Sequence, residues 1–219
     1  MKKLLDRIFI DGLGGMAQGL FATLIIGTII QQIGLFMGGG TGDLIYELGK
    51  IAAGLTGAGI GVGVARKLEA GHLVIVSAAV VGMIGAFAGK ILSGQVLVDG
   101  NLVLAGPGEP LGAFAAAYLA IEIGILISGK TKLDIILTLL VCMVTGSAVD
   151  LFVGPPISEF MLWLGSLINW GTEQQPFLMG IVVSVLMGMI LTLPISSAAL
   201  GVILNLSGLA AGAATSGCC

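Results

Sequence analysis

The stretch GGMAQGLFATLIIGTIIQQIGLF, residues 14–36, carries no charged side chain and decides the fold class. It belongs to a longer uncharged run between Asp11 and Asp43. A helix needs about 20 apolar residues to cross the hydrocarbon core of a bilayer, so this run predicts a first membrane-spanning helix. Only 10% of the 219 residues are charged, against about 25% in an average soluble domain. Lipid is therefore the solvent that suits most of the surface.

Further apolar runs predict an all-α, polytopic bundle of about six spans, which forms a single transmembrane domain over residues 1–219. The later runs cover residues 44–65, 73–92, 111–128, 134–153 and 177–193. Residues 157–170 place both tryptophans among the apolar side chains of an amphipathic segment, which predicts a helix at the membrane surface. Residues 196–219 follow a proline, which ends or kinks a helix, so we expect a broken or re-entrant segment there.

Basic residues occur in every second loop. They precede the first span and recur between spans two and three and between spans four and five, whereas the intervening loops contain acidic residues without Lys or Arg. Cytoplasmic loops are enriched in Lys and Arg, so the alternation predicts a multi-pass protein whose N-terminus is cytoplasmic. The basic residues concerned are Lys2, Lys3, Arg7, Arg66, Lys67, Lys130 and Lys132.

Glycine is unusually frequent, with 37 residues, and it falls inside the apolar runs. Small residues let helix backbones approach closely in lipid, so we interpret the glycines as packing positions. The densest stretch, Gly57-Ala58-Gly59-Ile60-Gly61-Val62-Gly63, is similar to the glycine stripe in the proton-ring subunit of rotary ATP synthases. It lacks the spacing and the strand-turn-helix context of a dinucleotide site, which leaves close helix packing as the interpretation.

Ionisable side chains at membrane depth are costly and usually mark a pathway for solute or ions. Glu122, deep in the fourth predicted span, is the first candidate for solute binding, and its alternative is a structural ion pair with a neighbouring helix, for instance through Lys90. Asp150 is a second candidate, with a simple interfacial acid as the alternative. Lys90 is a third, and it can also extend its amine to the outer interface. Glu47 and Lys50 share a helix face, which predicts local pairing.

Uncharged polar residues complete the predicted site. Gln18 in the first span can line a cavity or bridge two helices. Ser196 and Ser197 follow Pro194, and their hydroxyls can hydrogen-bond a polar solute. The sequence predicts no catalytic residue, metal site or cofactor, because His72 is the only histidine and the three cysteines lack metal or disulfide spacing. No basic tract indicates nucleic acid as a partner.

Four stretches give the chain a family resemblance. With them, it resembles over essentially all of its length the membrane-embedded IIC subunit of the bacterial phosphotransferase system, in the branch that includes regulator-like relatives of toxin-control membrane proteins. Residues 154–199 are the most specific part. The stretches are Asp11-Gly12-Leu13-Gly14-Gly15, Ser128-Gly129-Lys130-Thr131-Lys132, Val153-Gly154-Pro155-Pro156 and Leu191-Thr192-Leu193-Pro194-Ile195-Ser196-Ser197-Ala198-Ala199.

The resemblance implies a sugar permease of the bacterial plasma membrane that presents its solute for phosphorylation by cytoplasmic IIA and IIB components. The chain has no phosphoacceptor of the IIB kind, so phosphoryl transfer requires such a partner. The family also implies a longer chain, which fits the end of this sequence within an apolar stretch, and we expect a fragment. We further expect a homo-oligomer, with solute bound among spans four and five and the Pro194 segment.

Two alternatives stay open. A non-transporting membrane sensor or regulator relays a signal to a cytoplasmic partner, although the short loops 66–72 and 129–134 offer that partner little surface. A proton- or ion-translocating subunit uses Glu122 as its carrier and needs no organic solute. Uptake of a solute by reconstituted vesicles distinguishes the permease from both alternatives.

Overall fold

The computed structural model describes most of the chain up to residue 173. The described residues are 6–92, 94, 97–98, 101–102, 104, 106–130, 134–173 and 185. The chain forms two compact units, Met1–Pro155 and Pro156–Cys219. The regular elements described in the first unit are helices and one antiparallel hairpin of two-residue strands, β1 (Leu97–Val98) and β2 (Asn101–Leu102). The all-α prediction is confirmed.

Four helices in the described residues are long and apolar enough to cross a membrane, and a bent pair of helices adds a fifth candidate. Each of the first five predicted spans coincides with one of them. The sixth predicted span, 177–193, apart from Val185, and the predicted broken segment, 196–219, lie outside the described residues. The candidates are Arg7–Met37, the pair α4 (Gly39–Gly54) and α5 (Thr56–Lys67), α6 (His72–Leu92), α7 (Pro110–Ile127) and Asp134–Ile157 within α8 (Asp134–Glu173).

The first long helix contains two π-helical segments that the sequence does not reveal. It runs through η1 (Arg7–Gly12), α2 (Leu13–Leu20), η2 (Phe21–Ile25) and α3 (Ile26–Met37) without a break. Such π segments are rare and frequently occur at functional positions. The 31 residues of this helix extend over about 46 Å at 1.5 Å per residue, which exceeds the ~30 Å of hydrocarbon in a typical bilayer.

The second span is broken where the sequence predicts one continuous helix over 44–65. α4 ends at Gly54 and α5 begins at Thr56, with a bend of 49° between them. Leu55, at the break, has φ −85° and ψ 12°, outside the helical range. The Thr56 hydroxyl donates to the carbonyl oxygen of Ala53 at 2.6 Å. Glycine and a threonine that bonds back to the preceding turn are known causes of helix bending, and Gly54 and Thr56, on either side of Leu55, explain the break.

α2 packs against α5 through glycines on both helices. Gly15 and Gly19 of α2 lie against Gly63 and Gly59 of α5. A Cβ added to Gly15 would lie only 2.6 Å from the Gly63 carbonyl oxygen, so any side chain there separates the backbones.

The other two glycines of the dense stretch in α5 face α6. A Cβ on Gly57 would lie 2.5 Å from the Gly82 carbonyl oxygen, and one on Gly61 would collide with the Ala78 carbonyl oxygen. Two glycines of the stretch, four residues apart, thus face α2, and the other two, also four residues apart, face α6. This confirms the interpretation that the glycines are packing positions.

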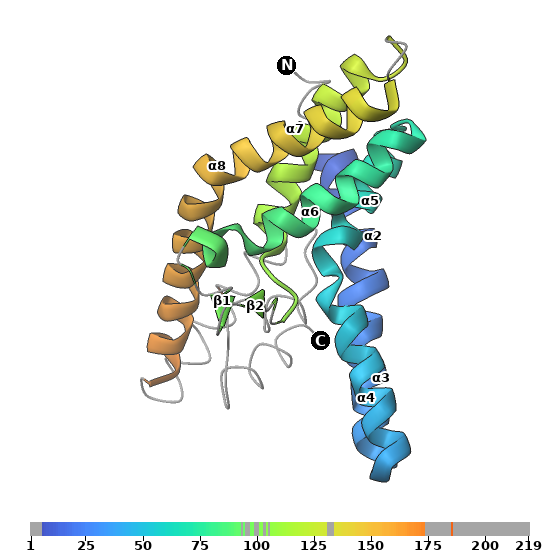
Figure 1. Ribbon diagram of the computed structural model, residues 1–219. Helices are drawn as coiled ribbons and strands as arrows, with labels where there is room; N and C mark the ends of the chain where they lie inside the picture. Colours follow the sequence, from blue (N-terminus) through green and yellow to red (C-terminus); the bar gives the residue numbers. More distant parts are fainter. Residues whose placement is uncertain are drawn as a thin grey trace. The chain divides into compact units, whose positions relative to one another are not determined.

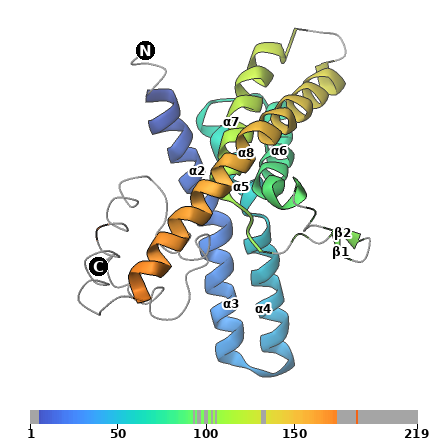
Figure 2. The ribbon, with the colours of Figure 1, turned by 90° about the vertical axis from the view of Figure 1, so that its left-hand side faces the viewer.

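α3 and α4 form a helical hairpin with its own glycine contacts. Figures 1 and 2 show the two helices side by side, leading away from α5, α6 and α7. A Cβ on Gly34 would lie 2.7 Å from the Gly42 carbonyl oxygen, and one on Gly49 would lie 2.6 Å from the Gly27 carbonyl oxygen. Gly38 makes the turn between the helices with φ 61°, a left-handed conformation that glycine adopts without strain.

A small apolar cluster joins α6, α7 and the first part of α8. Val81, Ala116, Ala120 and Cys142 are each at most 1% exposed. Cys142 is a free thiol in this core, as expected for a small apolar residue. The contact region between these three helices is therefore apolar.

α8 is longer than the predicted fifth span. The sequence predicts that the span ends at Val153 and that a separate surface helix covers 157–170, whereas α8 continues through Pro155 and Pro156 to Glu173. Prolines are tolerated inside membrane helices, where neighbours can satisfy the freed backbone groups. In the second unit, the rings of Phe160 and Trp163 stack with centroids 6.2 Å apart. Attachment of these aromatics to a membrane surface stays a prediction.

The glycine contacts generate a test on two adjacent residues of α2. We expect Gly15→Ala to destabilise the protein by about 1–3 kcal/mol through overpacking. Gly14→Ala is the matched control, because a Cβ there meets only the Lys67 Cε atom at 4.0 Å, and alanine favours the helix by up to about 1 kcal/mol. Thermal unfolding of the purified protein in detergent measures both. Equal melting temperatures for the two variants contradict the packing account.

Candidate functional site

Arg7 and Glu122 form an ion pair between the first helix and α7. Arg7 Nε donates to Glu122 Oε1 at 2.7 Å, and Nη2 donates to Oε2 at 3.4 Å. This two-point arrangement fixes the guanidinium relative to the carboxylate. The Glu122 side chain is still 31% exposed, so it is paired without being sealed from its surroundings.

Aromatic side chains of α7 surround this pair. Tyr118 precedes Glu122 by one turn, and its hydroxyl is within electrostatic range of both charged groups. The ring of Phe114 lies 5.7 Å from that of Tyr118, centroid to centroid. A Cβ on Gly12 would lie 3.2 Å from the Phe114 ring, so η1 sits directly on α7. The π segment η1 therefore brings Arg7 to Glu122.

One expectation about Glu122 needs correction. The sequence suggests Lys90 as its ion-pair partner, whereas the partner is Arg7, and Lys90 lies in the last turn of α6 at the other end of the bundle. α7 ends at Ile127, which puts Glu122 about 8 Å from the helix end at 1.5 Å per residue. The sequence signal for Arg7 is its position as the last base before the first uncharged run.

Other residues predicted to be cytoplasmic gather at the Arg7–Glu122 end of the bundle. Arg66 and Lys67 occupy the last turn of α5 and are exposed. The Lys67 Cε atom lies 4.0 Å from the Cβ position of Gly14, and Ser128 Oγ lies 3.7 Å from the Cβ position of Gly71. The loops after α5 and α7 thus share one end of the first unit with the start of η1.

Asp150 lies at the opposite end and is almost completely buried, with 3% of its surface exposed. It belongs to the part of α8 in which Gly154 approaches Ala88 of α6, with 3.1 Å between the Ala88 Cβ atom and a Cβ placed on Gly154. Glu109 is within electrostatic range of Asp150, and the Glu109 backbone N–H donates to the Ala86 carbonyl oxygen at 2.7 Å. This burial does not fit a simple interfacial acid.

Lys90 lies at the same end as Asp150. Its side chain is exposed, and its Nζ atom is 5.5 Å from the centroid of the Phe87 ring, a cation–π distance. The structure therefore brings Lys90 and Asp150 to one end and separates them from Glu122. Three other predicted site residues, Pro194, Ser196 and Ser197, lie outside the described residues.

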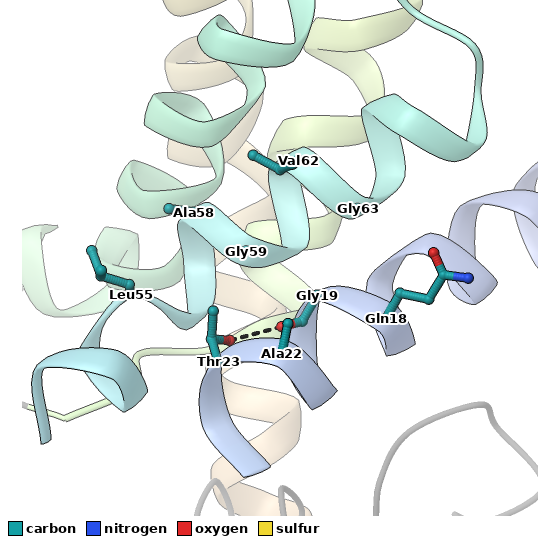
Figure 3. A pocket seen from close by; sticks show the side chains of 9 residues that line it. All are labelled: Gln18, Gly19, Ala22, Thr23, Leu55, Ala58, Gly59, Val62 and Gly63. Carbon is teal, nitrogen blue, oxygen red and sulfur yellow. Dashed lines mark hydrogen bonds between the residues drawn. The ribbon is translucent and has the colours of Figure 1, made fainter. Parts of the chain in front are cut away.

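A hollow of about 360 Å³ lies between the first helix and α5, next to the break in the second span. Its polar side chains are Gln18 and Thr23. Thr23 Oγ1 donates to the Gly19 carbonyl oxygen at 2.8 Å and lies 3.5 Å from Thr56 Oγ1. Figure 3 shows Gln18 at one end of the hollow, with its amide directed away from Thr23. The lining residues are Gln18, Gly19, Ala22, Thr23, Leu55, Ala58, Gly59, Val62 and Gly63.

The hollow by itself offers few hydrogen bonds to a polar solute, because most of its lining is apolar or glycine. The sequence does not reveal the pairing of Thr23 and Thr56, which depends on the helix break and on η2. Only the sequence Gly54-Leu55-Thr56 hints at the break. Within the part of the chain that the structure describes, no group of three or more His, Cys, Asp and Glu side chains is arranged to hold a metal ion.

Comparison with known proteins identifies the family. The family model described as "Phosphotransferase system, EIIC" matches residues 10–219. No curated protein and no solved structure matches the chain. EIIC domains sit in membranes and work with cytoplasmic IIA and IIB components, and the apolar helices described above suit that environment. The chain therefore belongs to the EIIC family and is a multi-pass membrane permease component of a phosphotransferase system.

Proposed function

We propose that this EIIC subunit moves a small polar solute, a sugar, across the inner membrane of a bacterium and releases it to IIA and IIB partners in the cytoplasm. The observation that carries the proposal is the burial of Asp150, with 3% exposure, in a bundle of apolar helices. An acid kept at such a position is costly and is by default a functional residue in a membrane protein.

In this proposal, Asp150 and Glu122 bind the solute at the two ends of its path across the membrane. A carboxylate accepts hydrogen bonds at about four lone-pair positions, which suits a solute rich in hydroxyl groups. At Glu122, each carboxylate oxygen accepts one bond from Arg7, so further positions are available to a solute. The partial exposure of Glu122 supports a role at release, and the burial of Asp150 supports a role in binding from the opposite side.

The distribution of charge supports an orientation with the N-terminus in the cytoplasm. Arg7, Arg66 and Lys67 share one end of the first unit, whereas Glu109, Asp150 and Lys90 lie at the other. Cytoplasmic surfaces of membrane proteins carry the excess of Lys and Arg. In this orientation, Glu122 lies on the side where the IIA and IIB partners operate.

Neutralising Asp150 tests the binding role. We expect Asp150→Asn to lower uptake by about 10- to 100-fold, since a hydrogen bond to a charged group contributes about 1.5–3 kcal/mol. Uptake of a panel of radiolabelled sugars into vesicles that contain IIA and IIB components measures the effect. Glu159→Gln, at an exposed acid of α8, is the control and should transport normally.

Wild-type uptake by Asp150→Asn would remove this residue from the path. The same vesicles, loaded with a pH-sensitive dye, test the alternative of ion translocation. Proton movement without sugar would overturn the proposal in favour of an ion-translocating subunit. Absence of uptake for every sugar with the wild-type chain would favour a sensor.

Glu122 is tested together with its partner. Glu122→Gln should lower uptake because the carboxylate is lost, while the protein stays folded and inserted. The exchange variant Arg7→Glu with Glu122→Arg restores an ion pair but moves the carboxylate to the other helix. We expect the exchange to recover the melting temperature relative to Arg7→Glu alone, without recovering uptake. Full recovery of uptake would make Glu122 a purely structural residue.

A further inference from the structure

The α3–α4 hairpin is joined to the rest of the first unit by two helical connections, and both are irregular. α2 passes into α3 through the π segment η2 (Phe21–Ile25), and α4 passes into α5 through the break at Leu55. The two irregular points lie next to each other, because the hydroxyl oxygens of Thr23 and Thr56 are 3.5 Å apart. The hairpin thus leaves the bundle at a level where neither connecting helix is a regular α-helix.

On one side of this level, close contacts hold the hairpin together. A Cβ on Gly34 of α3 would lie 2.6 Å from the Tyr46 backbone nitrogen of α4. The predicted pairing of Glu47 and Lys50 is also present in α4, with 3.5 Å between the Lys50 Nζ and Glu47 Oε1 atoms. Helices that touch along such a seam lose their dispersion contacts when they separate. We therefore expect α3 and α4 to move together.

On the other side of this level, the bundle is held in the same way. A Cβ on Gly19 of α2 would collide with the Gly59 carbonyl oxygen of α5, and one on Gly85 of α6 would lie 2.8 Å from the Gly112 carbonyl oxygen of α7. Figures 1 and 2 show the hairpin extending away from these helices. A change of angle between hairpin and bundle therefore requires no rearrangement inside either of them.

Gly54, the last residue of α4, is a glycine that neither packing nor backbone conformation requires. A Cβ placed on it would meet none of the described groups within 4 Å outside its own part of the helix, and its φ is not in the left-handed region. By contrast, Gly42 and Gly49 of the same helix contact the backbone of α3. Glycine favours a helix less than any residue except proline, so Gly54 makes bending at Leu55 easier.

Two threonine hydroxyls satisfy backbone carbonyls at the irregular points. Thr23 Oγ1 donates to the Gly19 carbonyl oxygen at 2.8 Å. Thr56 Oγ1 donates to the Ala53 carbonyl oxygen at 2.6 Å. The Leu55 N–H is shared between the carbonyl oxygens three and four residues before it, both at 3.2 Å. An unsatisfied backbone group is costly in lipid, so these donors allow both helices to bend without losing their hydrogen bonds.

The hollow beside the break provides room for such bending. It has a volume of about 360 Å³ and lies between the first helix and α5. Figure 3 shows that Thr23 and Leu55, one residue from each irregular point, both line it. A change of the angle at Leu55 therefore changes the width of the hollow.

We infer that the α3–α4 hairpin swings as one body about a hinge formed by η2 and residues 54–56, and that this movement changes the width of the hollow. Hinges are a few positions that absorb the backbone change between bodies that keep their shape. Both connections must bend together, because a bend in one alone would move α3 and α4 out of register. The movement needs no solute, and its use in uptake rests on the function proposed above.

Substitution of Gly54 by alanine tests the hinge without disturbing packing. We expect Gly54→Ala to favour the straighter form of the second span by about fivefold, which corresponds to the helix preference of alanine over glycine. Gly14→Ala is the matched control, because it also adds a Cβ where a helix has room but lies away from the hinge. Both variants should melt no lower than the wild type, so that a change in movement is not confused with unfolding.

Spin labels at Thr41→Cys and His72→Cys measure the movement. Both positions are exposed, one at the tip of the hairpin and one at the start of α6. In full-length chains with the three native cysteines replaced by alanine, double electron–electron resonance in liposomes gives the distances between the labels. We expect two populations in the wild type and in Gly14→Ala, and a shift toward the longer distance in Gly54→Ala, because straightening moves the tip away from α6.

Reaction of Ala58→Cys with N-ethylmaleimide, in the same cysteine-free background, measures access to the hollow. Its rate should change severalfold when Gly54→Ala is added and stay constant when Gly14→Ala is added. A single narrow distance that Gly54→Ala leaves unchanged would overturn the hinge, as would equal shifts in both alanine variants. An unchanged reaction rate would overturn the link to the hollow. Neither measurement needs sugar, so failure of the proposed transport would show separately, as absence of uptake by the wild type.

Discussion

Close approach of helix backbones at glycine is the constraint on which the first unit depends. Lipid tails are as apolar as the side chains, so the hydrophobic effect does not drive these helices together, and dispersion contacts and weak Cα–H···O bonds take over. α5 is the central case, because Gly59 and Gly63 contact α2 while Gly57 and Gly61 contact α6. A larger side chain at any of the four positions separates α5 from one of its neighbours.

The same constraint accounts for the broken second span. α5 is held between α2 and α6, whereas α4 uses Gly42 and Gly49 to contact α3. The change of partner coincides with Leu55, where the helix bends by 49°. The single predicted span thus consists of two helices that have different packing partners. The outer face of the α3–α4 hairpin is exposed in the described residues.

The helices place ionisable groups at both ends of an apolar interior. Arg7 and Glu122 meet at the end that also holds the basic loops, and Asp150 is buried at the other end near Glu109. Between them lies the cluster that includes Val81, Ala116 and Cys142. A permease needs polar contacts where solute enters and leaves, and an interior that opens only as helices move. Glycine contacts without large interlocking side chains suit such movement.

The sequence alone determined the class of the protein and the location of its first five candidate helices. A run of about twenty predominantly apolar residues indicates a membrane-spanning helix, so composition decides this point locally. The role of the Gly57–Gly63 stretch was equally predictable, because small residues in a membrane helix have few other uses. Glu122 and Asp150 stood out for the same reason: an acid in an apolar run is costly wherever the helix lies.

Only the tertiary structure decided which groups meet. Arg7 and Glu122 are separated by more than a hundred positions, and no local pattern links a base before the first span to an acid in the fourth. Burial of Asp150 depends on the approach of Gly154 to Ala88, which belongs to another helix. The bend at Leu55 falls where the second span changes its packing partner, and η1 contacts α7 through Gly12 and Phe114. Local sequence governs which medium a segment prefers, whereas pairing between helices depends on the simultaneous fit of several surfaces.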